Sequence, residues 1–599
     1  MGLVYTGLIL LPILWIASQL WALYNNYRAA LLTGLPIVVI PYNPHGFLHM
    51  VFSLPLRPLV KSLLPARVFS AAELVIAGWE FRDKAAAHIR MGPAFVIVTT
   101  GVNQLICADP ALAHEVLAKR KEFVRSKTAI KIMSFLGTNI LTVNGESWSR
   151  QRRIIAPAVN ERFSPDVWKE TAEQATSLAD HLLSSFPSAA SATASPAYGE
   201  SSDVIPGLRA VAVNVLTRVA YGHRKAFALP CLPRDPKANM SYVDGICLCA
   251  EFLVVAALVP IWMLRLPIMP KLVQTLGVAL AKLPELTRDM LDQERQRAAG
   301  KTSAGDAPDT IMSMLVRLSD QEKNQSDDAA PLEKKSVSFS NSSSNNNTST
   351  NKSYLTEEEI AGNLFIFTIA GFDSTTNTMA YGVVILAAYP EWQTWIQAEI
   401  DAVLGPVTSE GQDETLPDYA TAFPKLTRCL ALMFETLRLF PPLPHLVRSI
   451  VTTQTMSSSL SSPPTFPLQA PSVIYLNTVA LQTSPSTWGP DALDFKPTRW
   501  LQPVFKVDEA PQLKTPPRGA FLPWSAGPRV CPGQKMSQVE FVAVVATLFR
   551  KCTAEPVPRK EESMQQARQR LLDLMQDSQP AVTLQMKRPK DVHLRWARR

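Results

Sequence analysis

A single cysteine lies in a loop rich in glycine and proline, in the stretch WSAGPRVCPGQ from Trp524 to Gln534. The stretch that follows, QKMSQVEFVAVVATLFRK, has apolar residues at the spacing of one buried helix face. Cys531 is therefore expected at a helix N-terminus, where free N–H groups and the helix dipole favour a thiolate. Gly527 and Gly533 let the backbone turn tightly and leave room for a flat ligand. The chain must fold around whatever this sulfur binds.

The surroundings of Cys531 favour a soft metal centre with one protein ligand. The chain has seven scattered cysteines without a CxxC pair, and eight histidines without an HExxH motif. Neither a disulfide framework nor a zinc or iron–sulfur site is indicated. One thiolate, a flat approach and arginines that can pair with carboxylates are compatible with haem. A catalytic cysteine nucleophile is the alternative, although no histidine lies nearby in the sequence to activate it.

The first 27 residues carry no charged side chain, and Val4 to Leu23 is nearly all apolar. That length, about 20 residues, spans a bilayer as a helix. Aromatic residues near its end suit the membrane interface, and Arg28 is the first positive charge. A cleaved signal peptide has a charged start and a shorter apolar core. The sequence predicts an uncleaved single-pass anchor over residues 1–27, a proline-rich linker over 28–60, and a cytosolic domain over 61–599.

The remaining chain favours a mostly helical fold with a few short strands. Residues 319–353 are rich in Ser and Asn and are predicted to be a disordered insert. The run FLVVAALVPIWML, Phe252–Leu264, is too short to cross a bilayer, so it is either a buried helix or an apolar patch that dips into the membrane. The net charge of +8 is not interleaved with aromatic residues along one stretch, so nucleic-acid binding is not expected.

A long apolar helix is predicted from the cap residue Thr356 to Ala388, with Glu359 completing a capping box. Its middle, AGFDSTTN, holds residues that weaken a helix interior. This is either a tolerated kink or an opening where the helix meets a ligand. In the second interpretation, Asp373 beside Ser374 relays protons to something bound against Ala370 and Gly371.

Two groups of polar residues lie in otherwise apolar helices. Glu435 and Arg438 are three residues apart in LALMFETLRLFPP, and Arg499 in FKPTRWL is a third member of a buried structural clamp. Trp148 and Arg152 share one face of the helix in GESWSRQRR and can hold a carboxylate.

Several of these segments resemble motifs of the cytochrome P450 superfamily. WSAGPRVCPG resembles its haem-binding loop, Phe-x-x-Gly-x-Arg-x-Cys-x-Gly, and ETLR resembles its Glu-x-x-Arg helix. FKPTRW, AGFDST and WSRQR are similar to its Pro-x-Arg-Trp segment, oxygen-activation groove and Trp-x-x-x-Arg helix. The motifs occur in the family's order and cover roughly residues 30 to 590. The resemblance implies a mostly α fold with small β-sheets, the cytochrome P450 fold, preceded here by a single N-terminal transmembrane helix.

The resemblance also implies roles for individual residues. Cys531 matches the iron ligand of haem b (heme b), and Asp373 and Ser374 match the acid–alcohol pair that delivers protons, with Thr375 able to share the role. Residues that match cofactor-binding positions are Trp148, Arg152, Ala370, Gly371, Arg448, Trp524, Gly527, Arg529 and Gly533, of which Trp148 and the three arginines match propionate contacts. Two residues depart from the family: Trp524 replaces the usual Phe, and Ser374 the commoner Thr.

The implied protein is a membrane-anchored, fungal-type haem–thiolate monooxygenase that inserts one oxygen atom from O2 into a lipophilic small molecule in secondary metabolism. Electrons would come from NADPH through cytochrome P450 reductase, with cytochrome b5 as a further candidate donor, at the endoplasmic reticulum membrane. Arg150, Arg153 and Lys535 are expected to dock the reductase. A haem–thiolate isomerase or dehydratase, and a haem-binding protein without catalysis, remain as alternatives.

Overall fold

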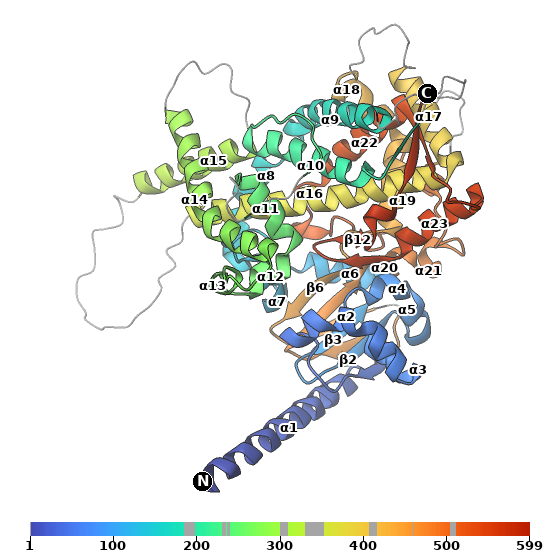
Figure 1. The fold of residues 1–599 in the computed structure, drawn as a ribbon. Coiled ribbons are helices and arrows are strands. Elements are labelled where there is room, and N and C mark those ends of the chain that lie inside the picture. Colours follow the sequence, from blue (N-terminus) through green and yellow to red (C-terminus); the bar gives the residue numbers. More distant parts are fainter. Residues whose placement is uncertain are drawn as a thin grey trace.

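The computed structural model describes residues 2–184, 198–230, 235, 240–299, 310–329, 353–405, 416–458, 460–503 and 511–599. In these residues the chain forms a large helical body with small sheets at its edge (Figure 1). The predicted fold class, mostly α with small β-sheets, is confirmed.

The centre of the body is α16 (Glu357–Ala388), a helix of 32 residues that crosses the whole body (Figure 1). Thr356 caps it, with the predicted capping box to Glu359. Buried residues lie on all sides of α16, as expected for a helix that is apolar all round. Helices packed around it include α8 (Gly145–Ala158), α9 (Ser164–Ser184), α10 (Val204–Tyr221), α11 (Tyr242–Glu251), α14 (Lys271–Ala299), α15 (Ile311–Ala329), α17 (Pro390–Leu404), α19 (Thr427–Leu439), α22 (Gln534–Lys551) and α23 (Met564–Gln576).

A six-stranded sheet lies below the helical body in the view of Figure 1. Its order is β1 (Ile37–Val39), β2 (Ala94–Val98), β3 (Asn103–Cys107), β9 (Ser472–Asn477), β6 (His445–Ile450) and β4 (Phe123–Val124). Strand β6 pairs antiparallel with β9 and places the buried Arg448 opposite Ile474. Two strands matter for the site: β11 (Ser578–Pro580) and β12 (Leu584–Met586) form an antiparallel hairpin beside α16.

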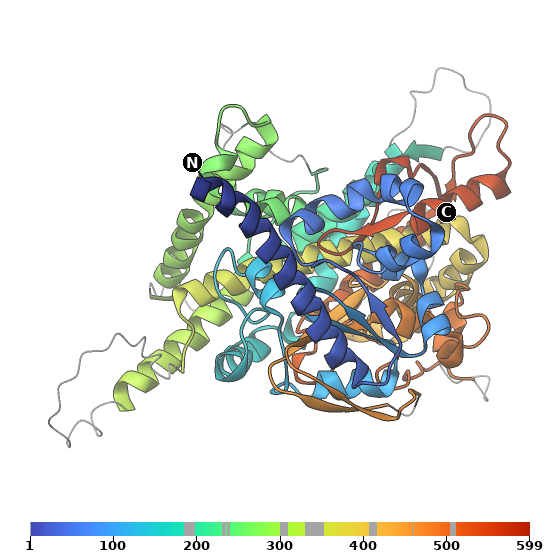
Figure 2. The ribbon, with the colours of Figure 1, turned by 90° about the horizontal axis from the view of Figure 1, so that it is seen from below.

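The N-terminal helix α1 (Gly2–Leu31) projects from the sheet end of the body (Figures 1 and 2). Its far part exposes apolar residues such as Leu11 and Trp15, while Ala30 is buried and Asn26 bonds to the sheet through the Thr99 carbonyl. The predicted span, Val4 to Leu23, lies within this helix. By length and composition, α10 is the helix among the described residues that passes as a candidate membrane span, and it is mostly buried inside the body.

Residues 28–60, the expected linker, contain the end of α1, strand β1 and most of α2 (Phe47–Leu63). Residues 319–329 of the expected insert belong to α15, and residues 330–352 lie outside the described part of the chain. The apolar run Phe252–Leu264 is buried in its first part and exposed near its end. Leu253 and Ala256 pack into the core, whereas Ile261 and Trp262 on α13 (Ile261–Leu264) are exposed.

Candidate active site

The cysteine loop closes on itself just before α22. The Cys531 N–H donates to the Trp524 carbonyl over 2.9 Å, and a 3-10 turn (Gly527–Arg529) lies between them. Gly527 has φ +68°, and a Cβ there would lie 2.5 Å from the Leu117 carbonyl oxygen, so glycine is required. Helix α22 begins after its cap residue Gly533, which places the Cys531 side chain just ahead of the helix with accessible surface.

Burial is the largest influence on the Cys531 thiol, and it raises its pKa. The Gly533 backbone and the Arg152 guanidinium act in the opposite direction but do not outweigh it. The Gly533 backbone thus favours the thiolate in the direction expected of a helix terminus, but the loss of hydration outweighs it in the free side chain. A bound metal cation supplies the charge that makes such a sulfur ionise.

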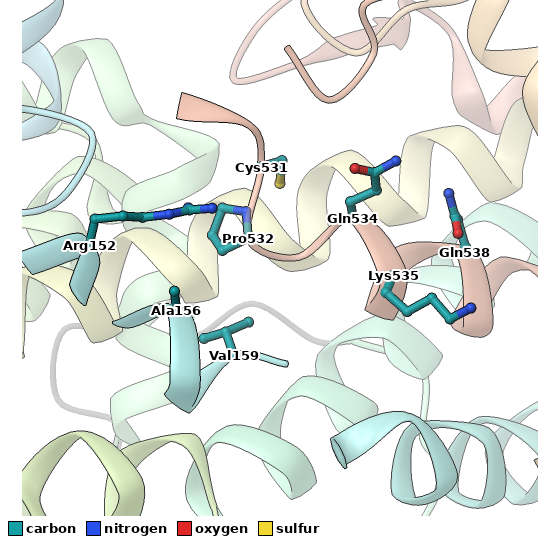
Figure 3. Close-up of a pocket in the computed structure, with 8 residues that line it drawn as sticks. All are labelled: Arg152, Ala156, Val159, Cys531, Pro532, Gln534, Lys535 and Gln538. Carbon is teal, nitrogen blue, oxygen red and sulfur yellow. The ribbon is translucent and has the colours of Figure 1, made fainter. Parts of the chain in front are cut away.

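A cavity of about 320 Å³ lies beside the sulfur between α8 and α22. Its lining residues are Arg152, Ala156, Val159, Cys531, Pro532, Gln534, Lys535 and Gln538. Figure 3 shows the Arg152 side chain extending from α8 toward Pro532, and Arg152 Nη1 donates to the Val530 carbonyl over 3.2 Å. Arg152 therefore braces the cysteine loop.

Three arginines form a positively charged cluster, made of the buried Arg448 and Arg529 and the partly buried Arg125. Burial and a neighbouring arginine lower the pKa of Arg125 to about 9 and those of Arg448 and Arg529 to about 10. The Nε atoms of Arg125 and Arg529 lack a hydrogen-bond partner among the described residues. A buried positive cluster of this kind is costly unless an anion joins it, so these residues fit the two propionates of haem. The sequence analysis did not single out Arg125, because its segment EFVRSK matches none of the motifs recognised there.

Trp148 links this cluster to α8. Its buried ring lies between two guanidinium groups, with Arg120 Cζ at 4.8 Å and Arg529 Cζ at 4.9 Å from the ring centroid. The sequence predicted that Trp148 and Arg152 hold one carboxylate together. The structure instead places Trp148 against Arg529 and turns Arg152 toward the cysteine loop.

The middle of α16 is helical without interruption. The Ser374 hydroxyl donates to the Ala370 carbonyl over 2.6 Å, and a Cβ at Gly371 would only touch Leu216 at 3.6 Å. Ala370 is exposed in an otherwise buried stretch, and Thr375 is buried. The surface of α16 is therefore accessible at Ala370, although the helix does not unwind there.

Asp373 has partners other than Ser374. Its Oδ2 accepts from the Thr583 hydroxyl over 2.6 Å and from Asn377 Nδ2 over 3.4 Å. Burial raises the pKa of Asp373, and the hydrogen bonds from Thr583 and the charge of Arg209 act against that rise. An acid held in this way can exchange protons closer to neutral pH than an exposed aspartate.

The clamp has the geometry that the sequence indicated. Glu435 and Arg438 are fully buried and form a two-bonded ion pair with both N–O distances 2.8 Å. Arg499 Nε donates to Glu435 over 2.9 Å, and Trp500 Nε1 donates to the other carboxylate oxygen over 2.9 Å. Arg438 also donates to the backbone carbonyls of Gln482 and Asp494, which lie far along the chain. Asp491, 3.5 Å from Arg499, supplies the second carboxylate, so two arginines face two acids, as buried ion pairs require.

Trp524 packs behind the loop, where its Nε1 donates to Ser537 on α22 over 3.1 Å and its ring meets Phe434 edge-on. Arg150 is not a free surface cation, because its guanidinium binds both carboxylate oxygens of Glu359. Arg153 and Lys535 are more exposed, with longer ion pairs to Glu322 and Glu161.

Comparison with known proteins agrees with this geometry. Residues 81–584 match the family model described as Cytochrome P450. The chain is 28% identical to a phomenoic acid biosynthesis cluster cytochrome P450 monooxygenase of Leptosphaeria maculans, covering 94% of each chain, and 25% identical to the cytochrome P450 monooxygenase prx9 of Penicillium rubens, covering 86% of each. A solved zebrafish cytochrome P450 has a similar fold, with a TM-score of 0.58 at 17% identity over 87% of this chain and 98% of that one. The chain belongs to the cytochrome P450 family, and it is a haem–thiolate monooxygenase.

Proposed function

We propose that this chain is a membrane-anchored monooxygenase in which Cys531 ligates the iron of haem b and one oxygen atom from O2 enters a lipophilic small molecule. The observation that carries this proposal is the cluster of Arg125, Arg448 and Arg529, whose positive charge has no carboxylate partner in the described part of the chain. Two propionates supply the missing negative charge.

When bound, haem supplies the iron centre at which O2 is activated. Cys531 Sγ donates electron density from the loop that the Trp524 carbonyl and Gly527 hold in place. Asp373 takes up protons and passes them toward Ser374 Oγ, which lies one residue along α16. To pass a proton on, the Ser374 hydroxyl has to break its hydrogen bond to the Ala370 carbonyl and rotate toward the accessible surface beside Ala370.

The substrate we propose is an apolar fungal metabolite. The relative in Leptosphaeria maculans is named for a phomenoic acid biosynthesis cluster, which supports a role in secondary metabolism. We propose that the mostly apolar segments 364–369 on α16 and 443–447 at the start of β6 (His445–Ile450) form its walls. Leu443 is exposed among them and offers a contact for such a ligand.

We propose that α1 crosses the endoplasmic reticulum membrane once, with the catalytic domain in the cytosol. Its exposed apolar side chains support this, as do exposed Leu48 and Leu63 on α2 and Trp262 on α13. Both helices lie on the side of the body from which α1 leaves (Figures 1 and 2). This face is suited to rest on a bilayer.

Electrons reach the iron from NADPH–cytochrome P450 reductase, with cytochrome b5 as a second donor, through the face that holds the cavity beside Cys531. Lys535 lines this cavity and Arg153 follows Arg152 on α8, and both are exposed enough to meet an acidic partner, whereas Arg150 is committed to Glu359. Charge reversal at Arg153 and Lys535 should slow reductase-driven turnover at low salt and leave the haem spectrum unchanged. Unchanged turnover would contradict this docking surface.

The experiment that tests the function uses microsomes holding the full chain and a reductase, fed with fungal extracts. We expect one compound to gain a single oxygen atom by mass spectrometry, dependent on NADPH and lost in Cys531→Ala. Conversion of a peroxide without reductase would favour the isomerase or dehydratase, and haem binding without any conversion would favour a non-catalytic protein.

A further inference from the structure

A polar stripe runs along one face of α16. Asp373, Asn377 and Tyr381 are spaced four residues apart, so their side chains lie one above another on the helix. This stripe faces the β11–β12 hairpin, which lies more than 190 residues further along the chain. The hairpin meets the stripe with two hydroxyl groups, those of Ser578 and Thr583.

The hydrogen bonds at Thr583 have a fixed direction. The Asn377 amide Nδ2 donates to Thr583 Oγ1 over 3.0 Å, and this amide nitrogen can only donate. The single proton of the Thr583 hydroxyl is therefore free to go to Asp373 Oδ2, 2.6 Å away. Both side-chain hydrogen bonds to Asp373 reach Oδ2, and the Thr583 backbone also donates to the carboxyl group. Because Oδ1 receives no side-chain donor among the described residues, we expect it to carry the proton when the acid is neutral.

The hairpin is anchored independently of this contact. The Leu584 N–H donates to the Pro442 carbonyl over 2.8 Å, and the Ala581 N–H donates to the Thr583 carbonyl over 2.9 Å. At the far end, Ser578 Oγ donates to the Met575 carbonyl and so accepts from the Tyr381 hydroxyl over 2.7 Å. The Thr583 hydroxyl thus sits on a rigid support, and Tyr381 fastens the same hairpin without touching Asp373.

We infer that Thr583 is a positioning residue, which holds the Asp373 carboxyl group in one orientation so that Oδ1 delivers protons toward the oxygen-binding side of α16. The inference rests on the proposed function, because that function makes Asp373 the proton donor. It also gives the β11–β12 hairpin a part in catalysis.

The charges around Asp373 allow this control. Arg209 on α10 favours the ionised form and Glu251 on α11 opposes it, and these two groups pair with each other over 3.1 Å. Arg209 donates to Glu251 and acts on Asp373 through its charge, whereas the Thr583 hydroxyl donates directly to Asp373. Removing the Thr583 hydroxyl takes away a hydrogen bond that lowers the pKa of Asp373, so burial should raise that pKa further.

The test compares three variants of the full-length haem protein: Thr583→Val, Thr583→Ser and Tyr381→Phe. The first readout is the infrared carboxylic-acid band of Asp373 followed across pH and assigned by its loss in Asp373→Asn. We expect Thr583→Val to move the protonation midpoint upward by about one pH unit, and Thr583→Ser and Tyr381→Phe to leave it in place. The second readout is the share of NADPH electrons lost as hydrogen peroxide, which should rise in Thr583→Val alone.

An unmoved midpoint in Thr583→Val overturns the inference, and so does an equal shift in Tyr381→Phe, because the effect would then come from a loosened hairpin. The infrared measurement needs no turnover. A native chain without the thiolate-ligated haem spectrum would overturn the proposed function instead, whatever the midpoint.

Discussion

At the scale of single residues, buried charge without a partner is the clearest mark of function in this protein. Arg125, Arg448 and Arg529 repel one another in a buried place where nothing described neutralises them. Buried arginines with a structural role are paired with carboxylates, as Arg438 is with Glu435. The cluster is explained by an anionic ligand, and haem brings two carboxylates.

Replacing Arg125 with Gln should therefore have effects of opposite sign on the empty and the loaded protein. Haem should dissociate about tenfold faster, because a charge-assisted hydrogen bond is lost. The haem-free chain should become more stable by about 1 kcal/mol, because repulsion is relieved. Haem transfer to apomyoglobin and urea unfolding measure the two effects, with the exposed Arg588→Gln as control. A loss of stability in both states would contradict the assignment.

Glu540 in the interior of α22 makes stability depend on pH. Burial raises its pKa to about 8, and its Oε1 has no partner among the described residues. The unfolded chain releases this proton near pH 4.5 and the native chain near pH 8, so stability is lost as pH rises through that window. The loss between pH 6 and pH 8 should be about 2–3 kcal/mol.

Urea unfolding at several pH values checks this expectation. Glu540→Gln should remove the pH dependence of this window, whereas Glu285→Gln, on the exposed face of α14, should keep it. An equally steep dependence in Glu540→Gln would show that another group is responsible.

At the scale of elements, the helices were largely predictable from the sequence, but the contacts between distant elements were not. The cap at Thr356, the end of α16 at Ala388 and the Glu435–Arg438 pair are local patterns, which depend on spacings of three or four residues. The contact between Asp373 and Thr583 joins residues 210 positions apart, and no local periodicity encodes it. Helix α16 stays helical through Gly371 and Ser374, because its packing against the body outweighs their weak helix propensity.

The clamp between α19 and the Pro497–Trp500 turn should be a major source of stability. Glu435→Leu leaves Arg438 buried without its counterion and should cost about 3–5 kcal/mol in unfolding free energy. Lys496→Gln, at an exposed side chain of the same segment, should change little. Denaturant unfolding of the haem-loaded protein measures the unfolding free energy of both variants. A loss below 1 kcal/mol in Glu435→Leu would contradict a major contribution of this ion pair to stability.

At the scale of the whole molecule, one side of the body carries the apolar surface. Helix α1, the exposed residues of α2 and Trp262 on α13 lie there, while the cavity beside Cys531 is bounded by α8 and α22. The sequence predicted the helix of residues 4–23 from its lack of charge. It left Phe252–Leu264 undecided, since burial of its first half depends on neighbours that lie far away in the chain.

Deletion of residues 2–20 should leave the domain folded, because Asn26 and Ala30, which hold α1 to the sheet, remain. The truncated chain should be released from microsomes by alkaline carbonate, whereas the full chain should stay until detergent is added. Adding Trp262→Ser to the truncated chain should weaken its remaining binding to vesicles. Release of the full chain by carbonate would contradict a spanning α1.

The most direct test of the account is the absorbance of the reduced, purified chain under carbon monoxide. A sulfur-ligated ferrous haem gives a strongly red-shifted band, which the native chain should show and Cys531→Ala should lack. A native chain without that band, or a Cys531→Ala variant that keeps it, would contradict iron ligation by Cys531.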